Sequence, residues 1–213
     1  ITSYIAQFKN AYPNINFTLE EREASTILPA LNSRHYDLAF VRDYHMDTDQ
    51  HSHLEIFKDK LLVAVSNKHR FAERKSVSLT ELSNENFITY NKGTIVHELS
   101  VEACRKAGFE PRVFYATLRG ASIIGLVASN SGVALMMEKV LKYYDRHDVV
   151  SIPLDETIAS KIVVAYIKNK KLFPNFNGWQ DGYAAFTYSI DAKENLINVC
   201  KESGRTSQNK NLY

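Results

Sequence analysis

The feature that most constrains the fold of this chain is a regular alternation of short apolar runs with amphipathic segments. The runs LAFV at residues 38–41 and LLVAVS at residues 61–66 are short and continuous, which is typical of strands buried on both faces. Around them, apolar residues recur at helical spacing, as at residues 27–31 and 96–107. Strands and helices that alternate through short connections predict an α/β fold built from parallel βαβ units.

The alternation forms two clusters, and no linker rich in Pro, Gly or Ser separates them. This pattern predicts a body of two lobes between which the chain crosses more than once. The chain opens in a helix at residues 2–11 and continues in a strand at residues 15–19. Because a parallel sheet needs a strand before such a helix, we expect a further strand upstream of residue 1. An amphipathic helix with Trp179, Tyr183, Phe186 and Ile190 and a disordered polar tail from residue 201 are predicted to end the chain.

Charge and cysteine usage narrow the function classes. The 213 residues include 26 Lys and Arg against 24 Asp and Glu, and the two signs are interspersed. A folded nucleic-acid binder usually shows a concentrated basic face, so this chain alone is not expected to hold DNA or RNA. No apolar run reaches the roughly 18 residues of a membrane span. Cys104 and Cys200 form no C-x-x-C pair, and Cys104 is predicted to be a reduced core thiol.

Catalytic and metal-binding signatures are weak. The motifs G-x-S-x-G, H-E-x-x-H, G-x-x-x-x-G-K-S/T and G-x-G-x-x-G are absent from the sequence. His97 and Cys104 stand about two helical turns apart, too far for a nucleophile and its base, and His97 is predicted to lie on the polar helix face. The alternating His and Asp residues of 45–53 resemble a metal site, but residues 44–54 are predicted to form a solvated loop. We therefore expect no enzyme activity, no metal and no cofactor.

Polar side chains follow the predicted strands where ligands of open α/β sheets bind, at the carboxyl ends. Arg42 and Asp43 end one strand, and Arg42 can serve an anionic ligand or an ion pair between lobes. Ser25 and Thr26 open a helix, where hydroxyl and N–H groups favour an anion. In the second cluster, Thr94 is also a plain N-cap candidate and Arg119 a candidate solvated arginine. The candidate binding residues are Ser25, Thr26, Arg42, Thr89, Tyr90, Asn91, Thr94, Arg119 and Ser122.

Six segments in order carry a family resemblance. They are FKNAYPNI, ALNSRHYDLAFV, LLVAVSNKHRFAER, SLTELSNENFI, EACRKAGFEPRV and IIGLVASNSGVALMMEKV. Over roughly nine tenths of its length, the chain resembles the effector-binding domain of LysR-type transcriptional regulators. Arg34 and Asn130 stand where the family pattern commonly has glycine.

The resemblance implies a two-lobed, periplasmic-binding-protein-like (type 2) α/β fold. Each lobe is expected to be a mostly parallel sheet flanked by helices, and crossing strands form the hinge. By the resemblance, the family's first strand and its N-terminal winged helix-turn-helix are expected to precede residue 1. Lobe I is expected to comprise residues 1–85 and 159–200, lobe II residues 86–158, and the tail residues 201–213.

The resemblance also implies a function. The chain is expected to be the sensing domain of a cytoplasmic DNA-binding transcriptional regulator. It is expected to bind a small anionic metabolite between its lobes. In the family, a Ser or Thr near the turn at Ser25 commonly contacts the effector. The implied partners are a homodimer or homotetramer, promoter DNA through the N-terminal domain, and RNA polymerase, but no membrane. The first helix is expected to pack against residues 123–129 of a second copy. The alternative is a transporter's solute-binding protein with the same fold.

Overall fold

The computed structural model describes residues 24–44 and 46–168, together with residues 6, 9, 10, 13 and 18–20. Several predicted segments fall wholly or largely outside these residues, so their predictions stay predictions. They are the helix at 2–11, the strand at 15–19, the last amphipathic helix around Trp179 and the polar tail from residue 201.

The first lobe is built on β1 (Ala39–Arg42), β7 (Ala159–Ile167) and the N-terminal part of β2 (His51–Ser66), in the order β1-β7-β2. Both pairings are antiparallel. Helix α2 (Ala24–Asn32) packs on this sheet. The strand side chains alternate between the two faces, and α2 covers one of them. The core on that face consists of Leu31, Ala39, Val41, Val163 and Ala165.

The second lobe continues the same long strand. Residues 61–66 of β2 pair with β5 (Ala134–Met137) and with β6 (Val149–Pro153), both antiparallel. β3 (Asn86–Tyr90) pairs in parallel with β4 (Arg112–Thr117). Ile88 N–H donates to the Val133 carbonyl at 2.8 Å, and Val133 N–H donates to the Asn86 carbonyl at 2.9 Å, which joins β3 to the β5 side.

Helices cover both faces of the second sheet. They are the 3₁₀ helix η1 (Leu79–Leu82), α3 (Ile95–Lys106), α4 (Gly120–Ala128) and α5 (Glu138–Tyr143). Leu61, Val63 and Val65 pack in one core cluster with residues of η1 and α3. Leu62 and Ala64 pack in another with residues of α4 and α5. The continuous apolar run of β2 is thus buried on both faces, as predicted from the sequence.

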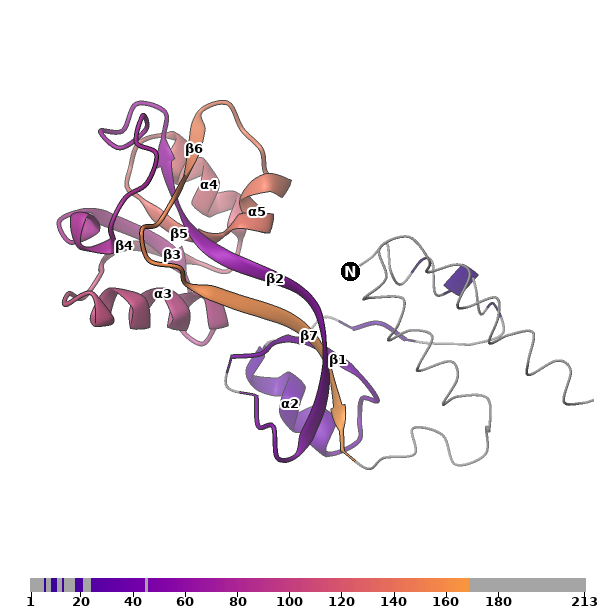
Figure 1. Cartoon of the computed structure of the whole chain (residues 1–213). Coiled ribbons are helices and arrows are strands. Elements are labelled where there is room, and N and C mark those ends of the chain that lie inside the picture. The colour runs from indigo at the N-terminus through magenta and orange to yellow at the C-terminus, as the bar shows by residue number, and fades with distance from the viewer. Residues whose placement is uncertain are drawn as a thin grey trace, which may run out of the picture.

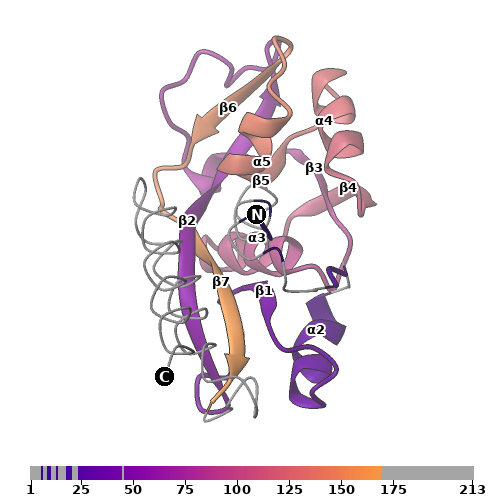
Figure 2. The same ribbon diagram turned by 90° about the vertical axis from the view of Figure 1, so that its right-hand side faces the viewer.

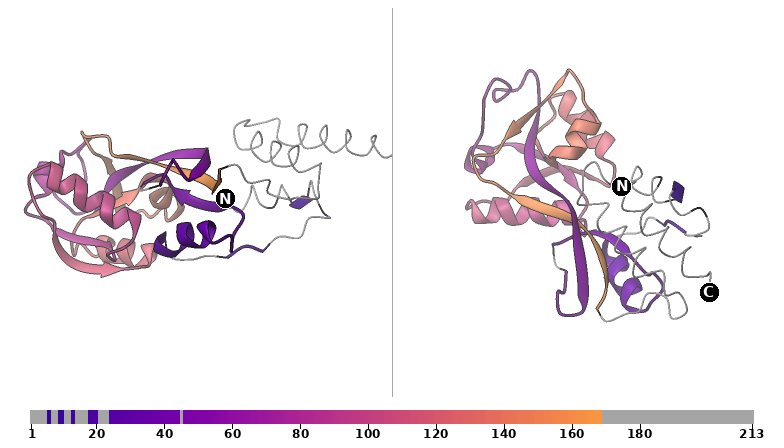
Figure 3. Two further views of the ribbon diagram at one scale, coloured as in Figure 1. Left: turned by 90° about the horizontal axis from the view of Figure 1, so that it is seen from below. Right: turned by 45° about the vertical axis from the view of Figure 1, so that its right-hand side comes forward.

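Two crossing strands connect the lobes. β2 and β7 run side by side from one lobe into the other (Figure 1), and the turned view in Figure 2 shows the same pair beside β1 and α2. Figure 3 repeats this arrangement from two further directions. Each crossing strand makes antiparallel pairs with its described strand neighbours, a feature that the alternation of helices and strands does not reveal.

The pairing of β2 also bears on the lobe boundaries. Residues 61–66 pair with β5 and β6, and Phe71, Val77, Leu79 and Leu82 share a core cluster with α3 and β5. The sequence analysis expected all residues up to 85 in the first lobe. We propose that the first crossing lies near residue 60 instead, and that residues 61–158 form the second lobe.

Most local signals in the sequence have the expected structural counterpart. Thr94 caps α3 by accepting from His97 N–H at 3.3 Å, and Gly108 follows that helix at φ 91°. Arg34 and Asn130 adopt φ of 61° and 58°, so both keep the left-handed backbone for which glycine is better suited.

Two local predictions were wrong. Residues 51–54 belong to β2 and not to the loop predicted for 44–54, because the strand pairs with β7 up to His51. His97 is buried and does not lie on a polar face, since its ring bonds to the preceding strand.

Candidate functional site

Arg42 occupies the carboxyl end of β1 and is largely buried, with 13% of its side chain exposed. Its Nη2 donates to Asp59 Oδ2 at 3.4 Å, whereas its Nη1 is buried and has no hydrogen-bond partner in the described part of the chain. Burial lowers the pKa of the guanidinium, and the charges of Asp59 and Asp43 oppose that shift. The Nη1 donors, buried without an acceptor, are available to the oxygen atoms of a ligand.

Asp59 connects three elements at the hinge. Only 1% of its side chain is exposed. Besides Arg42, its carboxylate accepts from the backbone N–H of Lys60 at 3.0 Å and from Lys139 N–H, in the first turn of α5, at 3.3 Å. Asp59 therefore links β1 of the first lobe to a helix of the second. Arg42 does form an ion pair, but its partner Asp59 precedes the crossing proposed near residue 60 and pairs with Ser160 of β7, so the predicted ion pair between the lobes stays a prediction.

Asp43 has a different role from its neighbour. Its carboxylate accepts from Lys161 N–H at 2.9 Å and from the Ser160 hydroxyl at 3.4 Å, and its own N–H donates to the Lys161 carbonyl at 3.0 Å. These bonds extend the pairing of β1 with β7 by one residue. Asp43 thus anchors the strand end that presents Arg42.

Tyr44 brings the same strand end into contact with the second lobe. Its ring packs against the core cluster that contains α3 residues, and its hydroxyl donates to Glu102 on α3. This hydrogen bond is the main cause that raises the pKa of Tyr44 to about 12. The lobes therefore touch two residues beyond Arg42.

Tyr90 is the candidate residue of the second lobe on whose phenol the charge of Arg42 acts. It ends β3 and is half-buried; burial raises the pKa of its phenol, Tyr144 adds to the shift, and the charge of Arg42 opposes it. Its hydroxyl lies close to the start of α4, because a Cβ on Gly120 would stand only 2.9 Å from Tyr90 Oη. The same Cβ would stand 3.2 Å from a ring carbon of Tyr144. The Tyr90 hydroxyl thus lies beside the N-terminus of α4.

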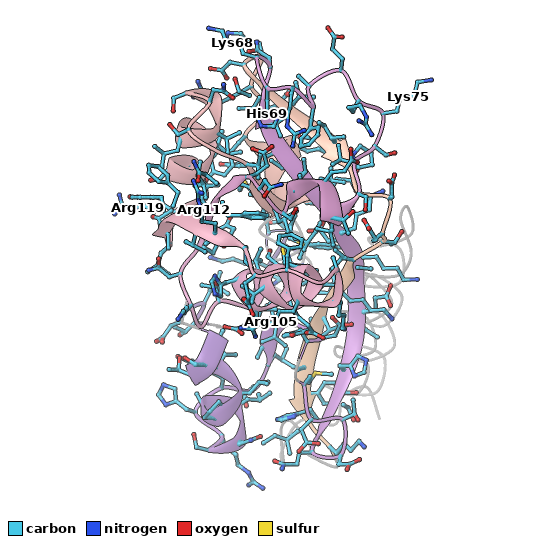
Figure 4. The ribbon with its side chains drawn as sticks, turned by 90° about the vertical axis from the view of Figure 1, so that its left-hand side faces the viewer. Lys68, His69, Lys75, Arg105, Arg112 and Arg119 are labelled. Atoms are coloured by element: carbon cyan, nitrogen blue, oxygen red, sulfur yellow. The ribbon has the colours of Figure 1, made fainter. Side chains whose placement is uncertain are left out.

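The N-terminus of α4 has no side-chain cap, whereas that of α3 is capped by Thr94. The N-cap residue Arg119 makes no side-chain capping bond. Its own side chain is exposed and projects outward beyond the end of β4 (Figure 4). Ser122, in the first turn of α4, is half-buried. The exposure of Arg119 favours the solvated arginine over a ligand grip.

The turn from β3 to α3 is largely satisfied by its own residues. The Thr94 hydroxyl donates to the Asn91 carbonyl at 2.8 Å and accepts from His97 N–H, so Thr94 serves as the N-cap. Thr89 is buried, and its hydroxyl lies 3.4 Å from His97 Nδ1. Asn91 remains half-buried at the turn. These contacts leave Tyr90 as the better placed candidate of this turn.

His97 is a residue of the candidate site that the sequence analysis missed. Its Nδ1 lies 2.8 Å from the Tyr90 carbonyl, so the ring fixes the backbone that carries Tyr90. The signal was its spacing of seven residues from Cys104, which places both on one helix face. Since Cys104 was predicted to be in the core, His97 should have been placed there too.

Ser25 and Thr26 lie exposed in the first turn of α2. This helix packs on β1, the strand that carries Arg42. Their predicted contact with a ligand therefore stays a prediction.

The described residues hold no group of three or more His, Cys, Asp or Glu side chains that could bind a metal. His51 of the predicted loop is buried, with Nε2 2.7 Å from Asn32 Oδ1 and Nδ1 3.0 Å from the Asp47 carbonyl. Among the helices described, none has the length and apolar character needed to cross a bilayer.

Cys104 is expected to resist modification. It is fully buried, and burial raises the pKa of its thiol to about 12, so little reactive thiolate forms at pH 8. In a Cys200→Ser background, we expect negligible reaction with a thiol reagent such as DTNB over an hour, and one thiol titrated after unfolding in urea. Rapid labelling of the native protein would contradict this prediction.

Comparisons with known proteins agree with this architecture. The model of a family described as the LysR substrate binding domain matches residues 1–181. The transcriptional dual regulator GltC of Bacillus subtilis (strain 168) is 26% identical over 192 residues, which cover 90% of this chain and 64% of GltC. The chain therefore spans less than two thirds of that relative.

Solved structures show the same fold. The C-terminal domain of a probable LysR family regulator from Rhodococcus sp. RHA1 has a TM-score of 0.75 at 20% identity, covering 90% of this chain and 92% of that one. The CcmR regulatory domain from Synechocystis PCC6803, solved in complex with 2-PG, has a TM-score of 0.75 at 18% identity, covering 87% and 90%. The predicted fold class is confirmed, and by the family match the chain belongs to the LysR substrate-binding domain family.

Proposed function

We propose that this chain is the effector-sensing domain of a DNA-binding transcriptional regulator and that it binds a small organic anion between its lobes. The observation that carries the proposal is the buried Nη1 of Arg42, which lacks an acceptor in the described part of the chain. A buried donor without a partner costs free energy that an anionic ligand recovers. CcmR, a protein of the same fold, was solved with the small ligand 2-PG.

The proposed ligand contacts come from both lobes. Arg42 supplies the cation from β1, Tyr90 supplies a hydroxyl from β3, and the N-terminus of α4 at Gly120 supplies backbone N–H groups. Ser25 and Thr26 on α2, Thr89 and Asn91 on the β3–α3 turn and Ser122 on α4 remain secondary candidates.

Closure of the lobes is the proposed signal. A ligand shifts a two-state equilibrium only by its differential affinity for the two states. An anion that bonds Arg42 and Tyr90 together favours the state in which these two residues are close. In the whole protein, we place the DNA contact in an N-terminal winged helix-turn-helix, with RNA polymerase as a further partner and the cytoplasm as its location.

A thermal-shift screen of small carboxylates tests the proposal. A ligand at 100 times its Kd adds about 2.7 kcal/mol of stability, which raises Tm by roughly 5 to 10 °C at this chain length. We expect hits among carboxylates, lost in Arg42→Gln and kept in Lys75→Gln, an exposed control. A screen in which only cationic or large apolar compounds raise Tm would refute the anionic ligand.

Gly120→Ala is expected to weaken binding of such a ligand about tenfold, which corresponds to ~1.4 kcal/mol. The added Cβ would stand 2.9 Å from Tyr90 Oη, so the phenol must move away from the α4 N-terminus. Isothermal titration with a carboxylate from the screen measures the loss. Gly125→Ala on the same helix is the control, because nothing lies within 4 Å of a Cβ there. Equal affinities of both variants would exclude Gly120 from the site.

We propose that the chain self-associates through β4 and the outer side of α4. Val113, Phe114, Tyr115 and Leu118 are between 42% and 60% exposed, and β4 pairs only with β3 among the described strands. An exposed apolar edge of this kind marks an interaction surface. The predicted partner segment, residues 123–129, must contribute through its outer residues, because Ile123, Ile124 and Val127 lie in the core.

Phe114→Glu is expected to dissociate this assembly. Phe114 is 60% exposed, so the substitution spares the core while it places a charge in the contact. Analytical ultracentrifugation should show that the dissociation constant of the oligomer rises at least tenfold, so that more of the protein is monomeric. Thr157→Glu, at another exposed position, should leave the oligomer unchanged. An unaltered oligomer in Phe114→Glu would place the interface elsewhere.

A further inference from the structure

Arg42 does not meet a ligand as a free cation. One of its terminal nitrogens already donates to Asp59 at 3.4 Å, so the guanidinium charge is matched by a carboxylate before any ligand arrives. Asp43, the next residue, adds a second negative charge that also acts on Arg42. The positive charge of Arg42 is therefore opposed by two carboxylates before any ligand binds.

Asp59 cannot move away to make room for another anion. Its side chain is only 1% exposed, and two backbone N–H groups hold the oxygen that does not face Arg42. Asp43 is held in the same way by Ser160 and Lys161. A bound anion thus meets Asp59 at short range, and every extra negative charge on it is repelled with little screening.

The hydrogen-bond donors are limited as well. Nη1 of Arg42, with its two N–H donors, has no partner in the described part of the chain, and Tyr90 offers one hydroxyl. Together with the backbone N–H groups proposed at the start of α4, these donors can serve the two oxygens of a carboxylate. A phosphate ester presents three terminal oxygens and free sulfate four, with up to two negative charges, and the second charge is opposed by Asp59.

We propose that Asp59 makes this site selective for a head group with a single negative charge, such as a monocarboxylate, over a doubly charged group such as sulfate or a phosphate ester. This inference rests on the proposed function, because it concerns the same anion site. Asp59 acts as a specificity-determining residue through the charge of Arg42. It does not need to touch the ligand.

Titration with two simple anions tests the proposal on this chain. Acetate and sulfate are added at pH 7 and matched ionic strength, and the backbone amides of Asp43 and Gly120 are followed in ¹⁵N–¹H NMR spectra. We expect saturable shifts with acetate and at least tenfold weaker binding of sulfate. Sulfate that binds as tightly as acetate overturns the charge selectivity and leaves the anion site standing. If neither anion shifts these amides saturably, the site and its selectivity both fall.

The variant Asp59→Asn tests the effect of the Asp59 charge alone. The amide oxygen can still accept from Lys60 and Lys139, so the hinge keeps those two bonds while the charge is removed. We expect sulfate affinity to rise at least tenfold and acetate affinity to rise much less. Asp155→Asn removes the same charge at an exposed position and should change neither. If Asp59→Asn raises the affinities for acetate and sulfate by the same factor, the proposal is overturned. If the variant does not fold, the comparison of acetate with sulfate on the unmodified chain decides it.

Discussion

Arg42→Met is expected to lower the free energy of unfolding by about 3 kcal/mol, because it leaves the Asp59 carboxylate buried without its cation. Asp59 is 1% exposed and would keep only the N–H groups of Lys60 and Lys139. Methionine retains the apolar stem, so the loss reports on charge more than on packing. Urea denaturation followed by circular dichroism measures the change.

The double variant Arg42→Met with Asp59→Asn distinguishes a stranded charge from a general loss of structure. Removing both partners of a buried pair is often close to neutral, so most of the lost stability should return. The exposed pair of Arg105 and Glu110 is the control, and Arg105→Met should make no measurable difference. A double variant as unstable as Arg42→Met alone would show that the charge of Asp59 is not the cause.

The parts of the fold that could be predicted from sequence are those with local causes. Residues 61–66 are apolar at every position but the last, which indicates a strand buried on both faces wherever it lies. Thr94 and Gly108 bracket α3 through a hydroxyl cap and a left-handed turn, and both operate within a few residues. Such signals do not depend on the rest of the chain.

The remaining features depend on partners distant in sequence. Residues 51–60 contain many polar side chains, and only their pairing with residues 159–167 of β7, far along the chain, makes them a strand. The same holds for Asp59, whose surroundings of Lys58 and Lys60 suggest a solvated segment. Its burial follows from Arg42 on β1 and from the Lys139 amide on α5. Arg42 was predicted as a site residue because a charge after an apolar strand is itself a local signal. Asp59, whose charge acts on Arg42, carries no such local signal.

Gly132→Ala is expected to destabilise the protein by about 3 kcal/mol, near the upper end of what overpacking usually costs. A Cβ at this position would stand 2.4 Å from the Asn86 carbonyl oxygen and 3.2 Å from its carbon. Both atoms belong to the backbone of β3. Val133, which follows Gly132, donates its N–H to the same Asn86 carbonyl at 2.9 Å. The clash can be relieved only by separating β3 from the β5 side of the sheet.

Gly125→Ala provides the matched control on the same protein. Gly125 is an exposed residue of α4 with nothing within 4 Å of a Cβ, so alanine should raise stability by about 0.5–1 kcal/mol through its better helix propensity. The two variants add the same methyl group and should shift the urea midpoint in opposite directions. Because β3 ends in Tyr90, Gly132→Ala should also weaken carboxylate binding, whereas Gly125→Ala should not. If Gly132→Ala costs less than about 1 kcal/mol, β3 can shift away from β5 easily, and it cannot be the rigid support that holds Tyr90 beside the N-terminus of α4.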